Sequence, residues 1–474
     1  MTSTETRSDF GDWLSPMLVK ELRQGMRSKV FMAAFYLTQL LMILCVIFNL
    51  TLASNAEAQK PLLGFLNGLF WFMISVPLLF VMPIRGFGAL HGEMKAGTLE
   101  LVFLTRLTAW RIAAGKWTAI VVQTLLLVCA ILPYVLLRYF LGGVDILADL
   151  QSVFFLLLAS AALTAVTIAI SPYESKLLRA LFVIGLIVGF QFLIGLIVAW
   201  VASSSFGGAA RSSVVGWPVY AGLAIFLPAF LILALEIGAS RIAPPAENHA
   251  LRKRLIGWYL LLAAPLFLLA GADANAVFAV MLFFLAVVFI DALAEPVVQV
   301  RSLYEPFLRR GRIGRLGALL FTPGWVSAAW YVGLTAALVG GLLAWQGQLN
   351  EPRQALGYIA FFGFLIFPAA LIRFFQPGTP FFLGFYIALQ FLLTALTVLV
   401  SMVSGIAGES LIAWLCFVPN SAFLLNLFNG VDSEHMTLFL SATSVVTAGS
   451  LAILLIRTLA PLRDIRAKMG TSIG

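Results

Sequence analysis

The sequence predicts an all-α integral membrane protein with about twelve transmembrane helices in two six-helix halves. Of its 474 residues 61% are hydrophobic and only 11% are charged, whereas about 25% of the residues of a soluble protein are charged. Uncharged runs of roughly 20 residues recur along the chain, which suits helices, because barrel strands are about 9–11 residues long with alternating polarity. Basic residues collect between alternate runs.

Twelve runs are long enough to cross a bilayer. They are 30–53, 62–84, 117–140, 151–171, 180–203 and 217–240 in the first half (30–240), and 255–272, 275–294, 325–346, 355–374, 381–405 and 437–457 in the second half (255–457). A further apolar run, 410–430, is interrupted at Pro419-Asn420. We expect this run to form a re-entrant or interfacial segment on the outer side.

The charge pattern predicts the orientation. With the N-terminus in the cytoplasm, only Lys60, Arg138, Arg211 and Arg353 of the 30 lysines and arginines fall outside, as expected because cytoplasmic loops retain basic residues. We therefore expect an inner membrane protein whose two termini are cytoplasmic, with no cleavable signal peptide. The net charge of +9 then belongs to the inner membrane face, and no nucleic-acid partner is expected.

The cytoplasmic parts in this prediction are an amphipathic helix over 1–29, a loop at 91–116, a basic linker at 241–254, a basic loop at 295–324 and a tail at 458–474. Each half has its longest inner loop between its second and third spans. FTPGW at 321–325 occupies the place of FLTRLTAW at 103–110, which is compatible with an internal duplication.

The loop at 91–116, HGEMKAGTLELVFLTRLTAWRIAAGK, predicts two short amphipathic helices. Gly97 suits a turn, and the Thr98 hydroxyl suits the N-cap of the first helix. Thr108 suits the N-cap of a second helix, with a hinge between Thr105 and Thr108. One interpretation lays the helices on lipid headgroups through Arg106, Arg111 and Lys116. The carboxylates Glu93 and Glu100 favour a protein partner instead, because anionic lipid repels them.

The run from Glu93 to Thr105, together with Ala114-Gly115-Lys116, resembles the signature of type-2 ABC transporter permeases: a glutamate, Gly-Thr-Leu-Glu, Leu-Thr-Pro and a later Gly-Lys. SPMLVKELRQGMRSK at 15–29 is similar to the connecting helix of that family. The resemblance covers the first six spans. Arg106 stands where the family usually has proline, so the hinge is expected to be less rigid here.

The resemblance implies that the chain is the permease subunit of an ABC transporter, an exporter, whose loop at 91–116 docks into a cytoplasmic ABC ATPase subunit. The implied coupling residues are Glu93, Gly97, Thr98, Leu99, Glu100, Leu101, Leu104 and Thr105, and those of the connecting helix are Pro16, Lys20, Glu21, Arg23 and Arg27. The chain has no GxxxxGK[ST] motif, so ATP and Mg would bind the partner. The chain itself is expected to bind no cofactor or metal and to catalyse no reaction.

The second inner loop clusters Arg309, Arg310, Arg312 and Arg315 but lacks Gly-Thr-Leu-Glu. It predicts either binding to the headgroups of membrane lipids or a degenerate second coupling element. In the latter case one chain supplies both transmembrane halves, and otherwise a second permease chain is required.

Two other functions remain open at this stage. An ion-coupled secondary transporter would need ionisable residues near the midplane, but Glu236 and Asp291 lie near span ends, in reach of Arg241 and Arg301. Arg138 and Arg373 are expected to extend to the interface. A membrane enzyme acting on lipid-linked substrates would need acids and bases on a loop, for which the outer-side candidates are Asp145, Asp149, Asp432, Glu434 and His435.

Overall fold

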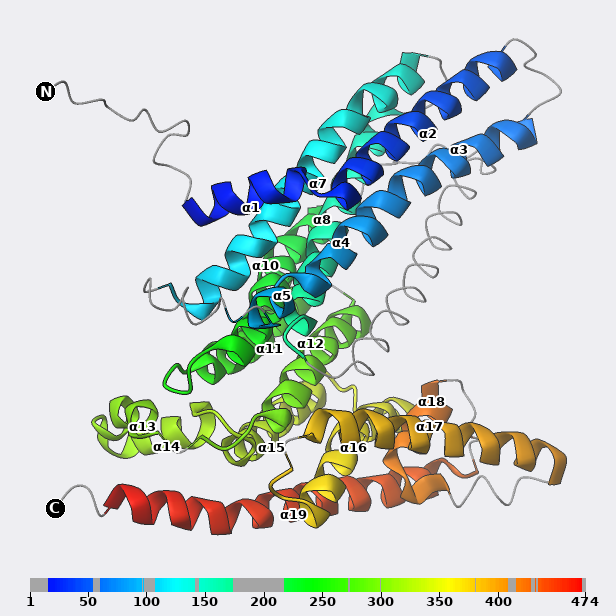
Figure 1. The fold of residues 1–474 in the computed structure, drawn as a ribbon. Coiled ribbons are helices and arrows are strands. Elements are labelled where there is room, and N and C mark those ends of the chain that lie inside the picture. The colour runs from blue at the N-terminus through cyan, green and yellow to red at the C-terminus, as the bar shows by residue number, and fades with distance from the viewer. Residues whose placement is uncertain are drawn as a thin grey trace, which may run out of the picture. The chain divides into compact units, whose positions relative to one another are not determined.

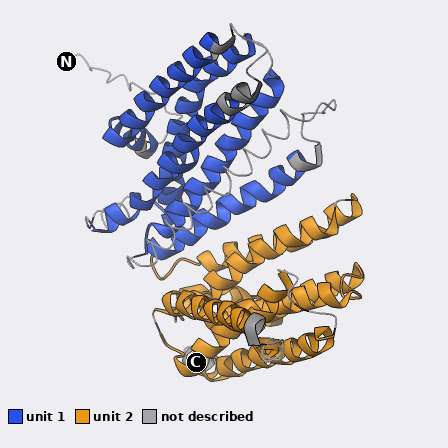
Figure 2. Cartoon of the chain, turned by 90° about the vertical axis from the view of Figure 1, so that its right-hand side faces the viewer, with its two compact units in different colours: residues 1–243 blue, residues 244–474 orange. Residues whose placement is uncertain are grey.

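The computed structural model describes residues 16–53, 60–95, 97, 107–140, 145–173, 217–271, 273–298, 300–379, 381–407, 415–427, 431 and 434–470. These residues are helical with short connections, and they contain no β-strand. The fold class is therefore all-α, as the sequence predicts. Two compact units divide the chain, residues 1–243 and 244–474 (Figure 2), and the boundary falls inside the basic segment 241–254.

Unit 1 is a bundle of long apolar helices preceded by one short amphipathic helix (Figure 1). Its elements are α1 (Pro16–Met26), α2 (Lys29–Ala53), α3 (Lys60–Ser75), α4 (Met82–Ile84), α5 (His91–Lys95), α7 (Ala109–Phe140), α8 (Ile146–Ile170) and α10 (Trp217–Ile242). A π-helical stretch, Val76–Val81, joins α3 to α4. Pro77 lies in this stretch and Pro83 lies in α4, and a proline removes a backbone donor from the regular helical ladder.

Unit 2 contains the remaining helices. They are α11 (His249–Leu269), α12 (Ala274–Ala294), α13 (Arg301–Leu308), α14 (Gly311–Phe321), α15 (Trp325–Trp345), α16 (Pro352–Phe375), α17 (Phe382–Ala407), α18 (Pro419–Leu427) and α19 (Met436–Gly470). Helices α13 and α14 form a hairpin at one end of this unit (Figure 1).

Ten stretches of the described helices are long and apolar enough to cross a membrane, which is the character of a multi-pass membrane protein. They are Lys29–Phe48, Asn67–Lys95, Ala109–Phe140, Ile146–Ile170, Tyr220–Ile242, Ala274–Ala294, Trp325–Trp345, Pro352–Phe375, Phe382–Val403 and Met436–Arg463. The predicted span 180–203 lies outside the described residues. The predicted span 255–272 falls mostly in α11. This helix is not among the ten, because its first turns carry Arg252, Lys253 and Arg254.

Exposed apolar side chains support this interpretation. Tyr36, Leu40 and Phe48 of α2 are each exposed by more than half of their surface. The buried side of the bundle instead packs aromatic and aliphatic residues such as Phe70 and Trp71 into one continuous core. Apolar surface on this scale is costly in water but not in lipid.

Two arginines depart from the expected interfacial position. Arg138 is 8% exposed and lies 3.6 Å from Asp149, with its guanidinium over the ring of Phe70. Arg373 is 2% exposed and donates hydrogen bonds to the carbonyl oxygens of Leu293 and Pro377. Both side chains join helix ends, so the prediction that they extend out to the interface is wrong.

Of the run 410–430, residues 415–427 are described. A 3-10 turn at Leu415–Phe417 precedes α18, and Pro419 is the first residue of that helix. A proline is well accommodated there, because the first helical N–H has no intrahelical partner. The break at Pro419 is therefore observed, although α18 has only nine residues.

Candidate functional site

The start of α7 meets two other elements at one buried lysine. Lys116 Nζ lies 2.8 Å from Glu93 Oε1 of α5 and 3.3 Å from Glu21 Oε1 of α1. The lysine side chain is only 7% exposed, and the two carboxylates are each exposed by about a fifth. One ammonium group therefore pairs with two carboxylates in partly dehydrated surroundings, where ion pairs are stronger than at an open surface. We call Glu21, Glu93 and Lys116 the lysine clamp.

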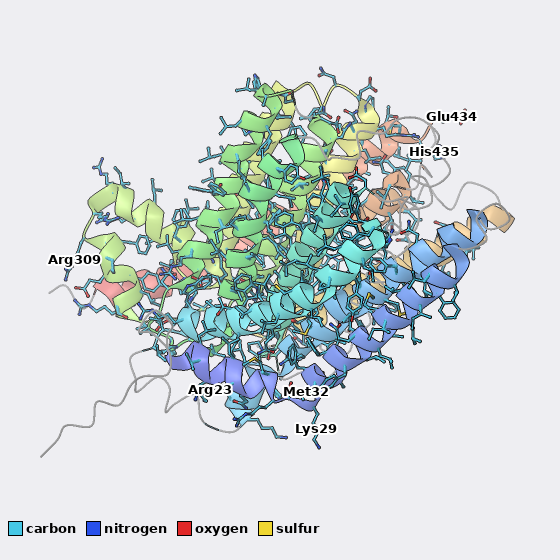
Figure 3. The ribbon with its side chains drawn as sticks, turned by 90° about the horizontal axis from the view of Figure 1, so that it is seen from above. Arg23, Lys29, Met32, Arg309, Glu434 and His435 are labelled. Atoms are coloured by element: carbon cyan, nitrogen blue, oxygen red, sulfur yellow. The ribbon has the colours of Figure 1, made fainter. Side chains whose placement is uncertain are left out.

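Helix α1 presents opposite faces to the protein and to solvent. Glu21 and Leu22 are half-buried, whereas Lys20, Arg23 and Arg27 are exposed. These three cations recur at i, i+3 and i+7, so they lie on one helical face, where they line a shallow surface depression with Val19 and Gln24. Figure 3 shows Arg23 at the outside of the bundle. Pro16 begins the helix.

Close backbone approach and an arginine hold the end of α1. A Cβ atom at Gly25 would lie 2.1 Å from Gln123 Nε2 of α7, so only glycine fits there without a shift of the glutamine. Arg85 donates from Nη2 to the carbonyl oxygen of Gly25 at 3.2 Å and to Ser28 Oγ at 3.4 Å. The Gly25 carbonyl oxygen also accepts from Ser28 N at 3.2 Å, so the guanidinium group adds a second hydrogen bond at the end of α1.

Segment 85–95 is attached to the end of α8 through one serine. Ser171 Oγ accepts hydrogen bonds from the N–H groups of Leu90 and His91 at 2.9 and 3.0 Å, and it donates to the carbonyl oxygen of Phe87 at 2.9 Å. Ser171 is fully buried. The position of Glu93 is therefore fixed by α8 as well as by Lys116.

The predicted coupling segment leaves this framework at Gly97. Its φ of 66° is the left-handed conformation that glycine adopts most readily, as expected for the turn. Thr98, Leu99, Glu100, Leu101, Leu104 and Thr105 lie outside the described residues. Where the described chain resumes, Thr108 Oγ accepts a hydrogen bond from Arg111 N at 3.4 Å, as expected for an N-cap.

The second helix predicted here, running from Thr108 through Trp110 and Ile112 into the third span, forms the first turns of α7 and is not a separate short element. Residues from Ala109 onward belong to α7, which is continuous for 32 residues. No helix-breaking residue separates Trp110 from the apolar run, so the helical hydrogen-bond ladder simply continues. The proposed contact of Lys116 with lipid headgroups is also wrong, because the clamp buries this side chain.

Unit 2 contains a second buried charge cluster, which the sequence analysis missed. Lys253 Nζ lies 2.5 Å from Asp291 Oδ2 and 2.7 Å from Glu295 Oε1, and Arg254 Nη2 lies 2.8 Å from Glu295 Oε2. Gly324 N donates to Glu295 Oε2 at 3.2 Å. Asp291 was expected near Arg301, but the first turn of α11 supplies its partner.

This cluster perturbs the ionisation of its members. Burial alone would raise the pKa of Glu295, but the charges of Lys253 and Arg254 lower it to about 2. Burial opposes the charged form of Lys253, yet Asp291 and Glu295 outweigh it and raise the pKa of the lysine. Glu295 and Lys253 are therefore charged at neutral pH, and the cluster joins the ends of α11, α12 and α15.

Two of the acidic residues that were candidates for a membrane enzyme, Asp145 and Asp149, have structural partners. Asp145 caps α8 by accepting from Leu147 N at 3.0 Å, and Asp149 pairs with Arg138. Glu434 and His435 lie at one end of unit 2 (Figure 3), and Asp432 lies outside the described residues. Within the described part of the chain no group of three His, Cys, Asp or Glu side chains is arranged to hold a metal.

Comparisons of this chain with protein-family models, with curated proteins and with solved structures found no match.

Proposed function

We propose that this chain is the transmembrane permease subunit of an ABC exporter, which moves its substrate by alternating access driven by ATP hydrolysis on a separate cytoplasmic subunit. The observation that carries the proposal is the lysine clamp. The resemblance to type-2 permeases depends on two separated sequence elements, 15–29 and 93–116. Glu21 of the first element and Glu93 of the second both contact Lys116.

A coupling device must pass a displacement from a soluble partner to the spans. Helix α7 suits this role, because its 32 residues correspond to about 48 Å at 1.5 Å per residue, longer than the hydrocarbon core of about 30 Å. Its first turns therefore extend beyond the membrane, where the clamp ties them to α1 and α5. Movement of either short helix is expected to move α7 as a rigid rod.

The surface around the clamp suits a protein partner. Lys20, Arg23 and Arg27 are exposed on α1, and the segment that follows Gly97 carries Glu100. A surface with both signs of charge matches a complementary protein better than it matches an anionic bilayer. In this proposal Thr98, Leu99 and Glu100 enter the ATPase subunit, while α1 borders the same partner.

Charge reversal at Glu100 tests the proposal. In membranes that contain the ATPase subunit, Glu100→Lys is expected to uncouple ATP hydrolysis from transport while leaving the chain folded and inserted. Glu351→Lys, a charge reversal at an exposed position in unit 2, serves as the matched control. Equal transport by the Glu100→Lys and Glu351→Lys variants would contradict the proposed role of Glu100 in coupling ATP hydrolysis to transport.

One observation favours a second candidate, an ion-coupled secondary transporter. Asp291 and Lys253 form a buried ion pair near the end of α12, and buried ionisable residues in such proteins often carry coupling ions. Transport that continues after ATP depletion but is abolished by an ionophore would favour this candidate. Transport that requires ATP and tolerates the ionophore would exclude it.

A further inference from the structure

The hairpin of α13 and α14 is closed by glycines. Gly311 has a φ of 67° at the turn, and a Cβ atom at Gly314 would lie 1.8 Å from the carbonyl oxygen of Phe307. The glycine face of α14 therefore packs directly on α13, while Leu303 and Tyr304 are buried beneath the hairpin. The opposite face of α14 points away from α13 and is exposed.

The base of the hairpin is fixed to the ends of two apolar helices. Trp325 N, at the start of α15, donates to the carbonyl oxygen of Glu295 just after α12 at 3.1 Å. Arg254 Nη1 donates to the carbonyl oxygen of Leu320 at 2.6 Å. Since α12 and α15 are both long and apolar enough to cross a membrane, the hairpin begins and ends at one face of that membrane.

The outward face of α14 combines apolar and cationic side chains. Ile313 is 82% exposed and Leu316 is 62% exposed, and Arg312 and Arg315 are exposed beside them. A spacing of three residues places the two aliphatic side chains on one side of the helix. Figure 3 shows Arg309 at the tip of the same hairpin.

Positive charge predominates on this surface. Segment 301–316 contains five arginines and a single acid, Glu305. Arg309 Nη2 lies 2.8 Å from Glu305 Oε1, so this carboxylate is neutralised within the hairpin. This surface is therefore complementary to an anionic layer.

We propose that α14 is a membrane-surface helix, which inserts Ile313 and Leu316 between anionic phospholipids while Arg312 and Arg315 bind their phosphate groups. An interfacial helix places apolar side chains at the acyl boundary and basic ones at the headgroups. The proposal needs α12 and α15 to span a membrane but does not depend on an ATPase partner. It assigns the hairpin to lipid in preference to a second protein subunit.

The test uses the full-length chain in bilayer discs made either of phosphatidylcholine alone or with one phosphatidylglycerol in three lipids. A nitroxide is attached at Ile313→Cys after the exposed Cys129 is replaced by serine, because Cys45 and Cys416 are buried. Collision rates with oxygen, which concentrates in hydrocarbon, and with a water-soluble nickel chelate report the surroundings of the label. We expect oxygen contact to dominate in the anionic discs.

Removal of Arg312 and Arg315 should shift the label at residue 313 from the hydrocarbon towards water in the anionic discs. Each arginine near an anionic surface contributes about a fivefold gain in partitioning, so R312Q/R315Q is expected to lower the ratio of membrane-embedded to exposed label about twenty-fivefold. A label at Ser302→Cys, exposed on α13, controls for general effects of the lipid. R309Q is expected to have a smaller effect, because Arg309 is already paired with Glu305.

Two results would overturn the proposal. In the first, the label at residue 313 stays accessible to the nickel chelate in both lipid mixtures. In the second, it is shielded from both probes only when a soluble ATPase subunit is added, which would identify the hairpin as a protein-docking element.

Discussion

Lys116 and Glu21 lie 95 positions apart in the chain, yet Nζ of the lysine is 3.3 Å from Oε1 of the glutamate. The contact joins the helix before the first apolar span to the beginning of α7. Glu93, near the end of the second apolar stretch, Asn67–Lys95, meets the same ammonium group at 2.8 Å. These elements therefore share one end of unit 1, as two successive crossings of a membrane require.

Removal of the ammonium group should loosen this end of the bundle. Lys116→Gln leaves Glu21 and Glu93 facing each other without a cation, at an expected cost of up to about 3 kcal/mol in the free energy of unfolding. Thermal unfolding in detergent measures the loss. Arg111→Gln, at an exposed position of the same helix, should have little effect. Glu21→Gln/Glu93→Gln/Lys116→Gln should recover part of the stability, and no recovery would contradict the clamp.

Gly25 is expected to tolerate no side chain. Gly25→Ala places a methyl group against Gln123, so it should displace α1 from α7 and increase proteolysis near residues 16–28. Gln123→Ala opens that space, and the double variant Gly25→Ala/Gln123→Ala should restore protection. Gly92→Ala, whose Cβ would meet nothing within 4 Å, is the control. If Gly25→Ala alone left the resistance to proteolysis unchanged, the close approach of α1 to α7 at this residue would not be needed to hold α1 in place.

Ser171 should contribute more stability than an ordinary helical serine. Ser171→Ala removes the acceptor for Leu90 N and His91 N, and a lost helix cap costs about 0.5–2 kcal/mol. Hydrogen exchange of these two amides should accelerate correspondingly. Ser152→Ala provides the comparison, because the Ser152 hydroxyl donates to the carbonyl oxygen of Ala148 in its own helix. Equal effects of the two variants would contradict the capping role.

The cluster around Glu295 predicts a defined dependence of stability on pH. Its pKa falls from an ordinary value of 4.5 to about 2 in the folded chain. Its contribution is therefore complete above about pH 4.5 and is lost as the pH falls towards 2. The pKa of Lys253 is raised above its ordinary value of 10.5. The contribution of this lysine to stability is therefore complete below pH 10.5 and is lost at higher pH.

Thermal unfolding of the wild type and Glu295→Gln at several pH values measures this dependence. The variant should be less stable at neutral pH, because it leaves Lys253 and Arg254 with less compensating charge. The difference between the two proteins should shrink below pH 4.5. A difference that stays constant between pH 7 and pH 2 would show that Glu295 is not ionised in the fold.

Local features were predictable from sequence and long-range partners were not. The turn at Gly97 and the N-cap at Thr108 follow from the properties of single residues, and the long helices follow from apolar runs. Lys116 gave no such signal, since an isolated lysine before a span is equally compatible with lipid contact. The clamp depends on residues brought together by packing.

The prediction for Arg138 failed for a similar reason. Asp149 and the ring of Phe70 satisfy its charge inside the bundle, so the side chain does not need to reach water. Asp291 likewise pairs with Lys253 and not with Arg301. Charge counts along the chain indicate which loops share a membrane face, but they do not identify which side chains meet.

Co-purification of the full chain from its native membranes, with assay of ATPase activity, tests the central claim most directly. The account predicts a stoichiometric ATPase subunit that is retained by the wild type and by Glu351→Lys but lost when residues 93–105 are disrupted. A chain that purifies alone in every detergent, with no ATPase activity, would contradict the proposed coupling role.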